Sequence, residues 1–221
     1  MRIYCKRSVF PTRVGVNRYR QNSEKRAVRF PHTRGGEPFG VKTGMAIWQA
    51  KQLCPQLVCV TPDYELYMHF SLKLRNLYLD YTNQVEPFGL DECWLDISAP
   101  GRDVEEGEQI AQSIRQRVKD ELGITVSIGV SYNKVFAKLG SDYKKPDATT
   151  VITRENYREI VWPLPVTALL YVGRAAERTL LGLRVRTIGD LAGCDRALLA
   201  SRMGKAGEML YDYANGLESV S

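Results

Sequence analysis

The sequence predicts an α+β fold, in which a mostly antiparallel sheet has two helices on one face and is followed by a small all-α region. Two observations predict it. Between residues 84 and 152, segments with a period of two and segments with a period of 3.6 residues follow each other in the order β-β-α-β-α-β. After Pro163 and Pro165, the remaining segments are short helices joined by Gly-containing turns. Right-handed crossovers would place the two helices of the first part on one face of its sheet.

The composition is that of a globular protein. The chain has 221 residues, 44% of them hydrophobic and 25% charged, which suits one large domain or two small ones. The sequence has no apolar run of the roughly 18 residues that span a membrane and no signal-peptide pattern. The five cysteines are scattered without a CxxC pair, which predicts free thiols in a reducing compartment. We therefore expect a cytoplasmic protein without a membrane partner.

The basic charge of the chain is confined to its N-terminal segment. Residues 1–42 contain eleven Lys and Arg against two Glu, a net +9, so the rest of the chain carries −3 of the total of +6. Residues 1–38 show no sustained period of 3.6 or 2, and only residues 13–19 resemble a strand. Three interpretations are open: a nucleic-acid-binding arm, a targeting segment, or a stretch that is not the native start of the domain.

The individual elements follow from hydrophobic periodicity and from the residues that begin and end helices. A helix at 104–122 is expected to start after the N-cap Asp103 and to stop at Gly123, and a helix at 133–143 is expected to start with Asn133. The other expected elements are helices at 45–54 and 64–81, strands at 57–61, 124–131 and 149–152, a hairpin at 84–98, and C-terminal helices at 166–171, 174–182, 187–192, 195–203 and 205–215.

Two neighbouring acids, Asp91 and Glu92, lie at the corner of the hairpin between apolar residues. If both were ionised about 4 Å apart in a partly buried site, their repulsion would be roughly 4 kcal/mol, or about three pKa units. The fold can splay them apart, protonate one, or place a divalent cation between them. Alternating neighbours on a strand point to opposite faces, which favours the first solution for this stretch alone.

Three further motifs accompany the acidic pair: FGVKTGM at 39–45, PFGLDECWLD at 87–96 and SYNKVFAKLGSDYKKPD at 131–147. Together with the small C-terminal helices, they resemble the Y-family translesion DNA polymerases, and most of all the bacterial DinB/UmuC-like group. The resemblance covers about residues 39–217.

The resemblance implies a DNA-directed DNA polymerase that copies damaged templates in DNA repair and the SOS response. It implies that Asp91 and Glu92 are catalytic residues that bind two Mg²⁺ ions, which activate the primer 3′-hydroxyl and carry the incoming triphosphate. Lys145 corresponds to the nucleotide-binding lysine, with a solvated surface lysine as the alternative. The weaker DNA-binding candidates are Lys138, at the rim of the active site, and the pair Gly173 and Arg174. The pair lies in a turn that resembles a helix-hairpin-helix, for which a plain linker is the alternative.

The implied partners are primer-template DNA and deoxynucleoside triphosphates, with a sliding clamp reached through C-terminal sequence that is missing here. The implied domains are an atypical basic segment at 1–38 outside the native family sequence, a remnant of the fingers at 39–62, a palm-like catalytic domain at 63–162, and a thumb-like helical domain at 163–221. The little finger domain is expected to be absent.

The chain also departs from the family pattern. The family begins with a strand that carries a further metal-binding Asp, but no Asp precedes Asp63, and the Tyr and Arg that hold the triphosphate are missing before Phe39. Our hypothesis is that residues 1–38 come from a frameshifted or misassigned start and that the chain lacks both ends of a polymerase. We expect the strands beside the missing one to lose their ladder partners, and little or no polymerase activity. The competing interpretations are a non-catalytic DNA-binding module and a partly folded relic without activity.

Overall fold

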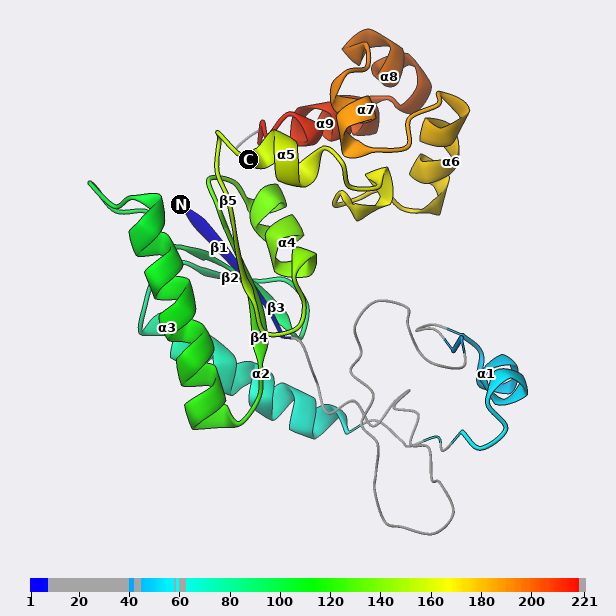
Figure 1. The fold of residues 1–221 in the computed structure, drawn as a ribbon. Helices are drawn as coiled ribbons and strands as arrows, with labels where there is room; N and C mark the ends of the chain where they lie inside the picture. Colours follow the sequence, from blue (N-terminus) through cyan, green and yellow to red (C-terminus); the bar gives the residue numbers. More distant parts are fainter. Residues whose placement is uncertain (8–39, 42–44, 58, 60–62, 219–221) are drawn as a thin grey trace.

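The computed structural model describes residues 1–7, 40–41, 45–57, 59 and 63–218. Within these ranges the fold is a five-stranded sheet with helices on both faces and a helical region at one end of the strands (Figure 1). The strands are β1 (Arg2–Arg7), β2 (Val85–Pro87), β3 (Glu92–Asp96), β4 (Val126–Ser131) and β5 (Thr149–Ile152). The helices up to the end of the sheet are α1 (Ile47–Leu53), α2 (Tyr64–Leu79), α3 (Val104–Leu122) and α4 (Lys134–Tyr143).

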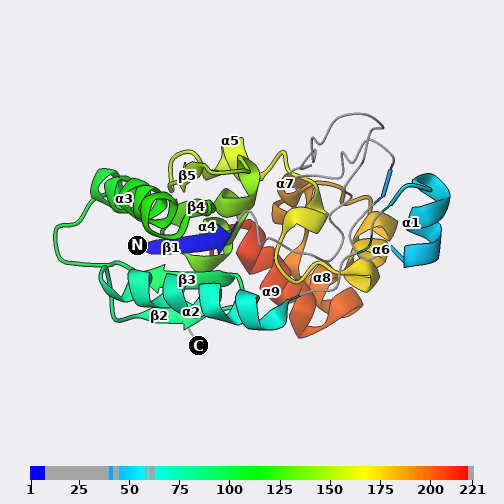
Figure 2. The same ribbon diagram turned by 90° about the horizontal axis from the view of Figure 1, so that it is seen from below.

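The strands lie in the order β2-β3-β1-β4-β5, which Figure 2 shows across the sheet. The pairs β2–β3, β3–β1 and β1–β4 are antiparallel, and only β4–β5 is parallel. The mostly antiparallel α+β sheet predicted from the sequence is therefore confirmed. The β-β-α-β-α-β order of the elements and the predicted residue ranges of α3 and β5 are confirmed as well.

The position of β1 corrects one expectation. β1 lies at the centre of the sheet, where Ile3 is register partner to Leu95 of β3 and to Val130 of β4. The expected loss of ladder partners for β3 and β4 is therefore wrong, because the first residues of the chain fill that place. The strand-like stretch at 13–19 lies outside the described residues.

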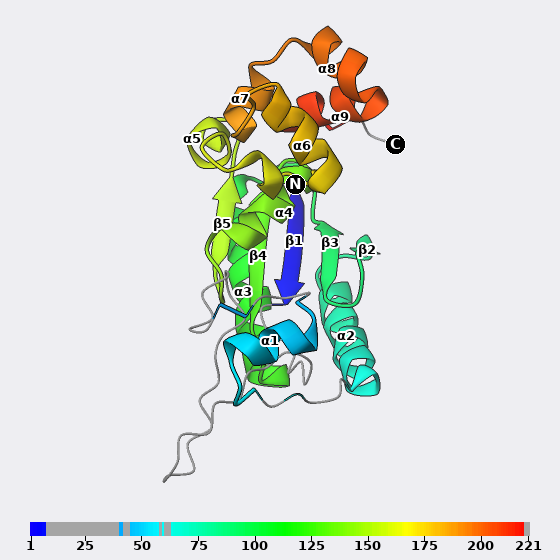
Figure 3. The ribbon, with the colours of Figure 1, turned by 90° about the vertical axis from the view of Figure 1, so that its right-hand side faces the viewer.

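One face of the sheet is covered by α2 and α3, as the first and third views show (Figures 1 and 3). Alternate residues of the strands point into this core, as expected for a strand with one buried apolar face. Its buried members are Ile3, Leu74, Leu77, Tyr78, Cys93, Leu95, Ile97, Ala111, Ile114, Val118, Val126, Ile128 and Val130.

The opposite face is covered by α4, which lies very close to β4. A Cβ at Gly129 would be 1.8 Å from the Ala137 carbonyl oxygen, and a Cβ at Gly140 would be 3.1 Å from the Gly129 Cα. The two helices that share one face are thus α2 and α3. The crossover argument, which placed α4 beside α3, is wrong on this point, because β4 offers α4 a surface of Ser and Gly without bulky side chains.

The helices α3 and α4 begin at the caps predicted from the sequence. The Asp103 carboxylate accepts the Glu106 N–H at 2.9 Å, and α3 ends at Gly123 with a left-handed φ of 64°. At α4, the Asn133 side-chain oxygen accepts the Phe136 N–H at 2.7 Å, and its amide nitrogen donates to the Gly216 carbonyl at 3.0 Å. Asn133 therefore caps α4 and also holds the end of the C-terminal region against it.

The C-terminal region consists of α5 (Tyr157–Val161), a 3-10 turn η1 (Val166–Ala168), α6 (Arg174–Gly182), α7 (Ile188–Ala192), α8 (Arg196–Met203) and α9 (Lys205–Ala214). Four helices agree with the prediction, the expected helix at 166–171 is reduced to η1, and α5 was not predicted. The core of this region continues into the sheet region, because Phe136 and Leu139 of α4 and Ile152 of β5 belong to the same buried cluster as Leu180 and Leu199.

The predicted strand at 57–61 is the remaining difference. Leu57 and Cys59 are not in a strand, and residues 58, 60 and 61 lie outside the described ranges. None of the described helices combines the length and the apolar composition needed to cross a membrane.

The α4–β4 contact predicts that Gly129→Ala is strongly destabilising. The added Cβ would overlap backbone atoms of α4, which cannot move aside as a flexible side chain would. We expect a loss of about 3 kcal/mol or more in the free energy of unfolding, measured by urea denaturation. Gly182→Ala is the control, because a Cβ there meets no atom within 4 Å. Equal stability of the two variants would contradict the close packing of α4 on β4.

The double role of Asn133 predicts that Asn133→Ala costs more than loss of a cap alone. Removal of the cap costs about 1 kcal/mol, and the buried Gly216 carbonyl left without its donor adds roughly 1–3 kcal/mol. Asp103→Ala removes only an exposed cap, and we expect it to cost about 1 kcal/mol in the same urea titration. If the two variants were equally stable, the bond to Gly216 would contribute nothing.

Candidate active site

The acidic pair lies where a tight turn leads into β3. The Phe88 N–H donates to the Glu92 carbonyl at 2.8 Å, and Gly89 takes the positive φ of 80° that the turn requires. Arg75 of α2 donates from Nη2 to the Gly89 carbonyl at 3.0 Å. Asp91 is the last residue of the turn and Glu92 is the first residue of β3. Both acids therefore lie at the corner that was predicted from the sequence.

Glu92 lies on the face of the sheet that α4 covers. Two residues further along β3, Trp94 donates from its indole nitrogen to the Lys134 carbonyl of α4 at 3.1 Å, and residues two apart on a strand share a face. The Lys138 ammonium lies 3.2 Å from one carboxylate oxygen of Glu92 and 3.3 Å from the other. The two side chains are only 16% and 11% exposed, so a half-buried cation is already held against this acid.

The charges continue in alternation along α4. Lys138 Nζ is 3.9 Å from a carboxylate oxygen of Asp142, and Asp142 forms an ion pair with Lys145. The structure thus joins three predicted site residues, Glu92, Lys138 and Lys145, through a fourth, Asp142, that sequence reasoning missed. The spacing of 138 and 142 along the predicted helix could have indicated it, since residues three and four apart are neighbours on a helix surface.

The neighbouring thiol is not part of the reactive chemistry. Burial raises the pKa of the Cys93 thiol, and the Asp91 and Glu92 carboxylates raise it further, against the opposite effect of Arg75. Cys93 is 5% exposed and its side chain belongs to the core with α2 and α3. At neutral pH it therefore remains a protonated thiol inside the core.

The donor atoms of the corner suit a magnesium ion whose coordination is completed by other molecules. Carboxylate oxygens are hard ligands, and Mg²⁺ is commonly bound through one or two carboxylates together with substrate phosphates and water. Within the described residues, no three His, Cys, Asp or Glu side chains gather into a group that could hold a metal ion. Asp91 and Glu92 are therefore of the chemical type that a partial Mg²⁺ site requires, and the Lys138 ammonium is paired with Glu92 on this face.

Gly173 and Arg174 lie in the helical region, at the start of α6, and both are exposed. They follow Leu170, which packs against the cluster of Trp94 and Ala137. Lys138 and Lys145, in contrast, belong to the charged series on α4 and just after it.

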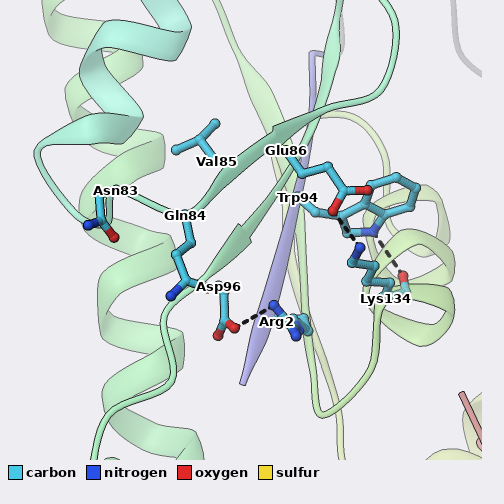
Figure 4. A pocket seen from close by; sticks show the side chains of 8 residues that line it. All are labelled: Arg2, Asn83, Gln84, Val85, Glu86, Trp94, Asp96 and Lys134. Atoms are coloured by element: carbon cyan, nitrogen blue, oxygen red, sulfur yellow. Dashed lines mark hydrogen bonds and ion pairs between the residues drawn. The ribbon is translucent and has the colours of Figure 1, made fainter. Parts of the chain in front are cut away.

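A pocket of about 250 Å³ lies on the same face of the sheet as α4 (Figure 4). Its lining residues are Arg2, Asn83, Gln84, Val85, Glu86, Trp94, Asp96 and Lys134. The four charged residues are paired with one another, Arg2 with Asp96 and Lys134 with Glu86. The charges of the acidic corner and of α4 are paired as well, so pairing alone does not distinguish the two places.

Comparison with known proteins agrees with this choice. Residues 36–142, which include the acidic corner and most of α4, match the impB/mucB/samB family. The chain is 53% identical over 181 residues to a DNA polymerase IV of Acetivibrio thermocellus, which covers 82% of this chain and 45% of the relative. It is 38% identical over 195 residues to a DNA polymerase IV of Pseudomonas aeruginosa, covering 88% and 56%. The chain thus spans about half the length of the curated relatives it matches.

Solved structures give the same result for the fold. DinB from Sulfolobus solfataricus matches with a TM-score of 0.74 and 28% identity, over 83% of this chain and 55% of that one. A DinB family error-prone DNA polymerase from the same organism matches over 100% of this chain and 67% of its own, with a TM-score of 0.81. Because the identity is only 24%, this match supports the fold alone. Residues 36–142 therefore match the impB/mucB/samB family, and the described part of the chain has the palm-like fold of the Y-family DinB polymerases.

Proposed function

We propose that this chain carries the catalytic region of a DNA-directed DNA polymerase of the translesion type, which transfers nucleotides to a primer 3′-hydroxyl by two-metal catalysis. The observation that carries the proposal is the meeting of the acidic corner with the cations of α4: Glu92, beside Asp91, is in contact with Lys138, and the series continues to Lys145. Acids for metal ions next to a lysine for phosphate are what phosphoryl transfer requires. The DNA polymerase IV relatives support the same activity.

Each side chain then has a role. Asp91 and Glu92 would hold Mg²⁺, which when bound would supply positive charge for the developing charge on the phosphate oxygens. Lys145 binds the triphosphate of the incoming deoxynucleotide as a point charge. The contact with Glu92 supports a role for Lys138 at the rim of the metal site, in addition to the DNA contact predicted for it.

The proposed DNA contacts lie at the start of α6. Gly173 precedes the nine-residue helix α6, whose first N–H groups and positive dipole end suit a phosphate, and the exposed Arg174 adds a charge there. One of the similar solved structures is titled as an insertion ternary complex of a DNA polymerase, which supports primer-template DNA and a nucleotide as partners. A sliding clamp, damaged templates, the SOS response and a cytoplasmic location stay predictions.

The domain division is also kept as a proposal: fingers remnant at 39–62, palm at 63–162, thumb at 163–221, and an atypical segment at 1–38, of which residues 2–7 supply the central strand β1. The acidic corner supplies two carboxylates, and the described residues add no third ligand beside them. We therefore propose that activity is low in this chain because the metal ions would be under-coordinated, even though the sheet itself is complete.

The metal-binding role predicts Mg²⁺-dependent binding of a deoxynucleoside triphosphate. A fluorescent dATP analogue should bind the chain more tightly with Mg²⁺ than with EDTA. Asp91→Asn, Glu92→Gln and Lys145→Gln should each weaken binding roughly tenfold or more, about 1.4 kcal/mol. Asp120→Asn is the control, because Asp120 is exposed on α3, on the opposite face of the sheet. Salt-dependent DNA affinity with nucleotide binding indifferent to Mg²⁺ and to Asp91 would instead identify a DNA-binding module.

The incomplete metal site predicts little or no primer extension by residues 1–221 with Mg²⁺ and all four deoxynucleotides. The measurement is extension of a labelled primer on gels, with a DNA polymerase IV relative as the positive control. Robust extension that Asp91→Ala abolishes would contradict the prediction, because two carboxylates would then be enough for catalysis in this chain.

A further inference from the structure

The loop that carries Lys145 is held by a helix on the opposite face of the sheet. It joins α4, which ends at Tyr143, to β5, which begins at Thr149, and Asp147 lies two residues after Lys145. Arg115 belongs to α3, and Figure 1 shows α3 and α4 on opposite faces of the sheet. The Arg115 guanidinium forms an ion pair with Asp147, so this loop is bound to the helix across the sheet.

Arg115 holds both the backbone and the side chain of Asp147. Its Nη2 donates to the Asp147 carbonyl at 2.7 Å and to the carboxylate oxygen Oδ1 at 3.2 Å, and its Nε donates to the same oxygen at 3.2 Å. Its Nη1 lies 3.4 Å from the hydroxyl oxygen of Thr149, so one guanidinium spans the end of the loop and the first residue of β5. Lys119, four residues further along α3, lies with its ammonium 2.6 Å from Oδ2 of Asp147.

The backbone of Asp147 gives these contacts a purpose. Its φ is 52°, in the left-handed region that residues other than Gly, Asn and Asp seldom adopt. The side chains of Arg115 and Asp147 are 16% and 27% exposed, so their interaction is less screened by solvent than that of a fully exposed pair. The contacts therefore stabilise one conformation of a loop whose backbone alone would not favour it.

We propose that Arg115 is a positioning residue for Lys145: by fixing Asp147, it holds the loop where the Lys145 ammonium can meet a polyphosphate. The proposal rests on the proposed function for its ligand, the triphosphate that Lys145 binds. It goes beyond that function in assigning a role to a side chain on the far face of the sheet. On the near face, Lys145 is paired with Asp142 of α4, so the loop has an anchor on each side.

The chemistry of the two side chains suits this division of roles. A guanidinium is a planar fork that bonds to a carbonyl and a carboxylate at the same time, so Arg115 can fix a backbone conformation. An ammonium group is a point charge on a flexible stem, so the protein places Lys145 mainly through its backbone. A loosely held loop would spread the ammonium over several positions and lower its affinity for a phosphate.

A plain effect of charge is the alternative explanation, because any cation near the site attracts a polyanion. The two explanations make opposite predictions for Asp147. If charge alone matters, removing this acid strengthens the binding of a nucleoside triphosphate. If Asp147 anchors the loop, removing its charge weakens the binding, even though an acid has been lost.

The test is the affinity of the full chain for a fluorescent dATP analogue in the presence of Mg²⁺. We expect Asp147→Asn and Arg115→Met each to weaken binding roughly fivefold or more. Asn also tolerates the left-handed backbone, so Asp147→Asn keeps the proposal testable if Arg115→Met does not fold. Arg117→Met is the matched control and should leave the affinity unchanged, because Arg117 lies on the same helix but pairs with Asp80 and Glu121.

Two further measurements separate positioning from an independent contribution. Arg115→Lys keeps the charge but loses the fork, and we expect it to bind as weakly as Arg115→Met. In a Lys145→Gln background, neither Arg115→Met nor Asp147→Asn should weaken binding further, because the side chain that they position is gone. Urea unfolding of each variant establishes that it is folded at the assay temperature.

The outcomes distinguish the two ways of failing. If Lys145→Gln weakens binding but Asp147→Asn strengthens it or leaves it unchanged, the positioning role is overturned and the proposed function stands. The same holds if the effects of Arg115→Met and Lys145→Gln multiply in the double variant. If Lys145→Gln leaves the affinity unchanged, or the wild-type chain does not bind the nucleotide, the phosphate role of Lys145 fails and the positioning role fails with it.

Discussion

The site depends on one packing constraint, the close approach of α4 to the centre of the sheet. Gly129 has no Cβ, and its place is taken by the backbone of α4 at Ala137 and Ser141. Because of this contact, α4 lies low enough on the sheet for Lys138 to reach Glu92 at the first position of β3, 46 residues away in sequence. The same helix holds the C-terminal region through Asn133 and through the buried side chains of Phe136 and Leu139. One helix thus positions the cations and joins the two parts of the described fold.

The arrangement of charge is better explained by function than by stability. A buried ion pair pays a desolvation penalty that often cancels its attraction, so the Glu92–Lys138 pair is weak evidence for a stabilising role. Four alternating charges that extend from an acidic corner to a lysine near the end of α4 suit a site that takes up a cation and an anion together. Trp94 and Phe88, whose ring centres are 4.7 Å apart, provide apolar surface beside Lys138.

The sequence was sufficient for much of the fold because local features determine it. The N-cap Asp103 and the stop at Gly123 gave the bounds of α3 correctly, and Asn133 gave the start of α4. β1 was missed because its six residues contain three basic ones and because its stability comes from ladder bonds to β3 and β4, both distant in sequence. α5 was missed because it is five residues long and its N-cap Asn156 makes no side-chain bond to the helix. Which face α4 would cover depended on the absence of side-chain bulk at Gly129, a property of the packed sheet.

In the candidate site too, sequence motifs identified individual residues, whereas contacts between residues required the structure. Asp91, Glu92 and Lys145 were identified from their sequence motifs, but the role of Lys138 beside Glu92 and the position of Asp142 between two lysines required coordinates. The most direct measurement of the central claim is a crystal structure of the chain soaked with Mn²⁺ and a deoxynucleoside triphosphate, with the metal located by anomalous scattering. The account predicts an anomalous peak in contact with carboxylate oxygens of Asp91 and Glu92, and Lys145 at the phosphates. A metal bound elsewhere, with the two acids turned away from each other and Lys138 still on Glu92, would contradict it.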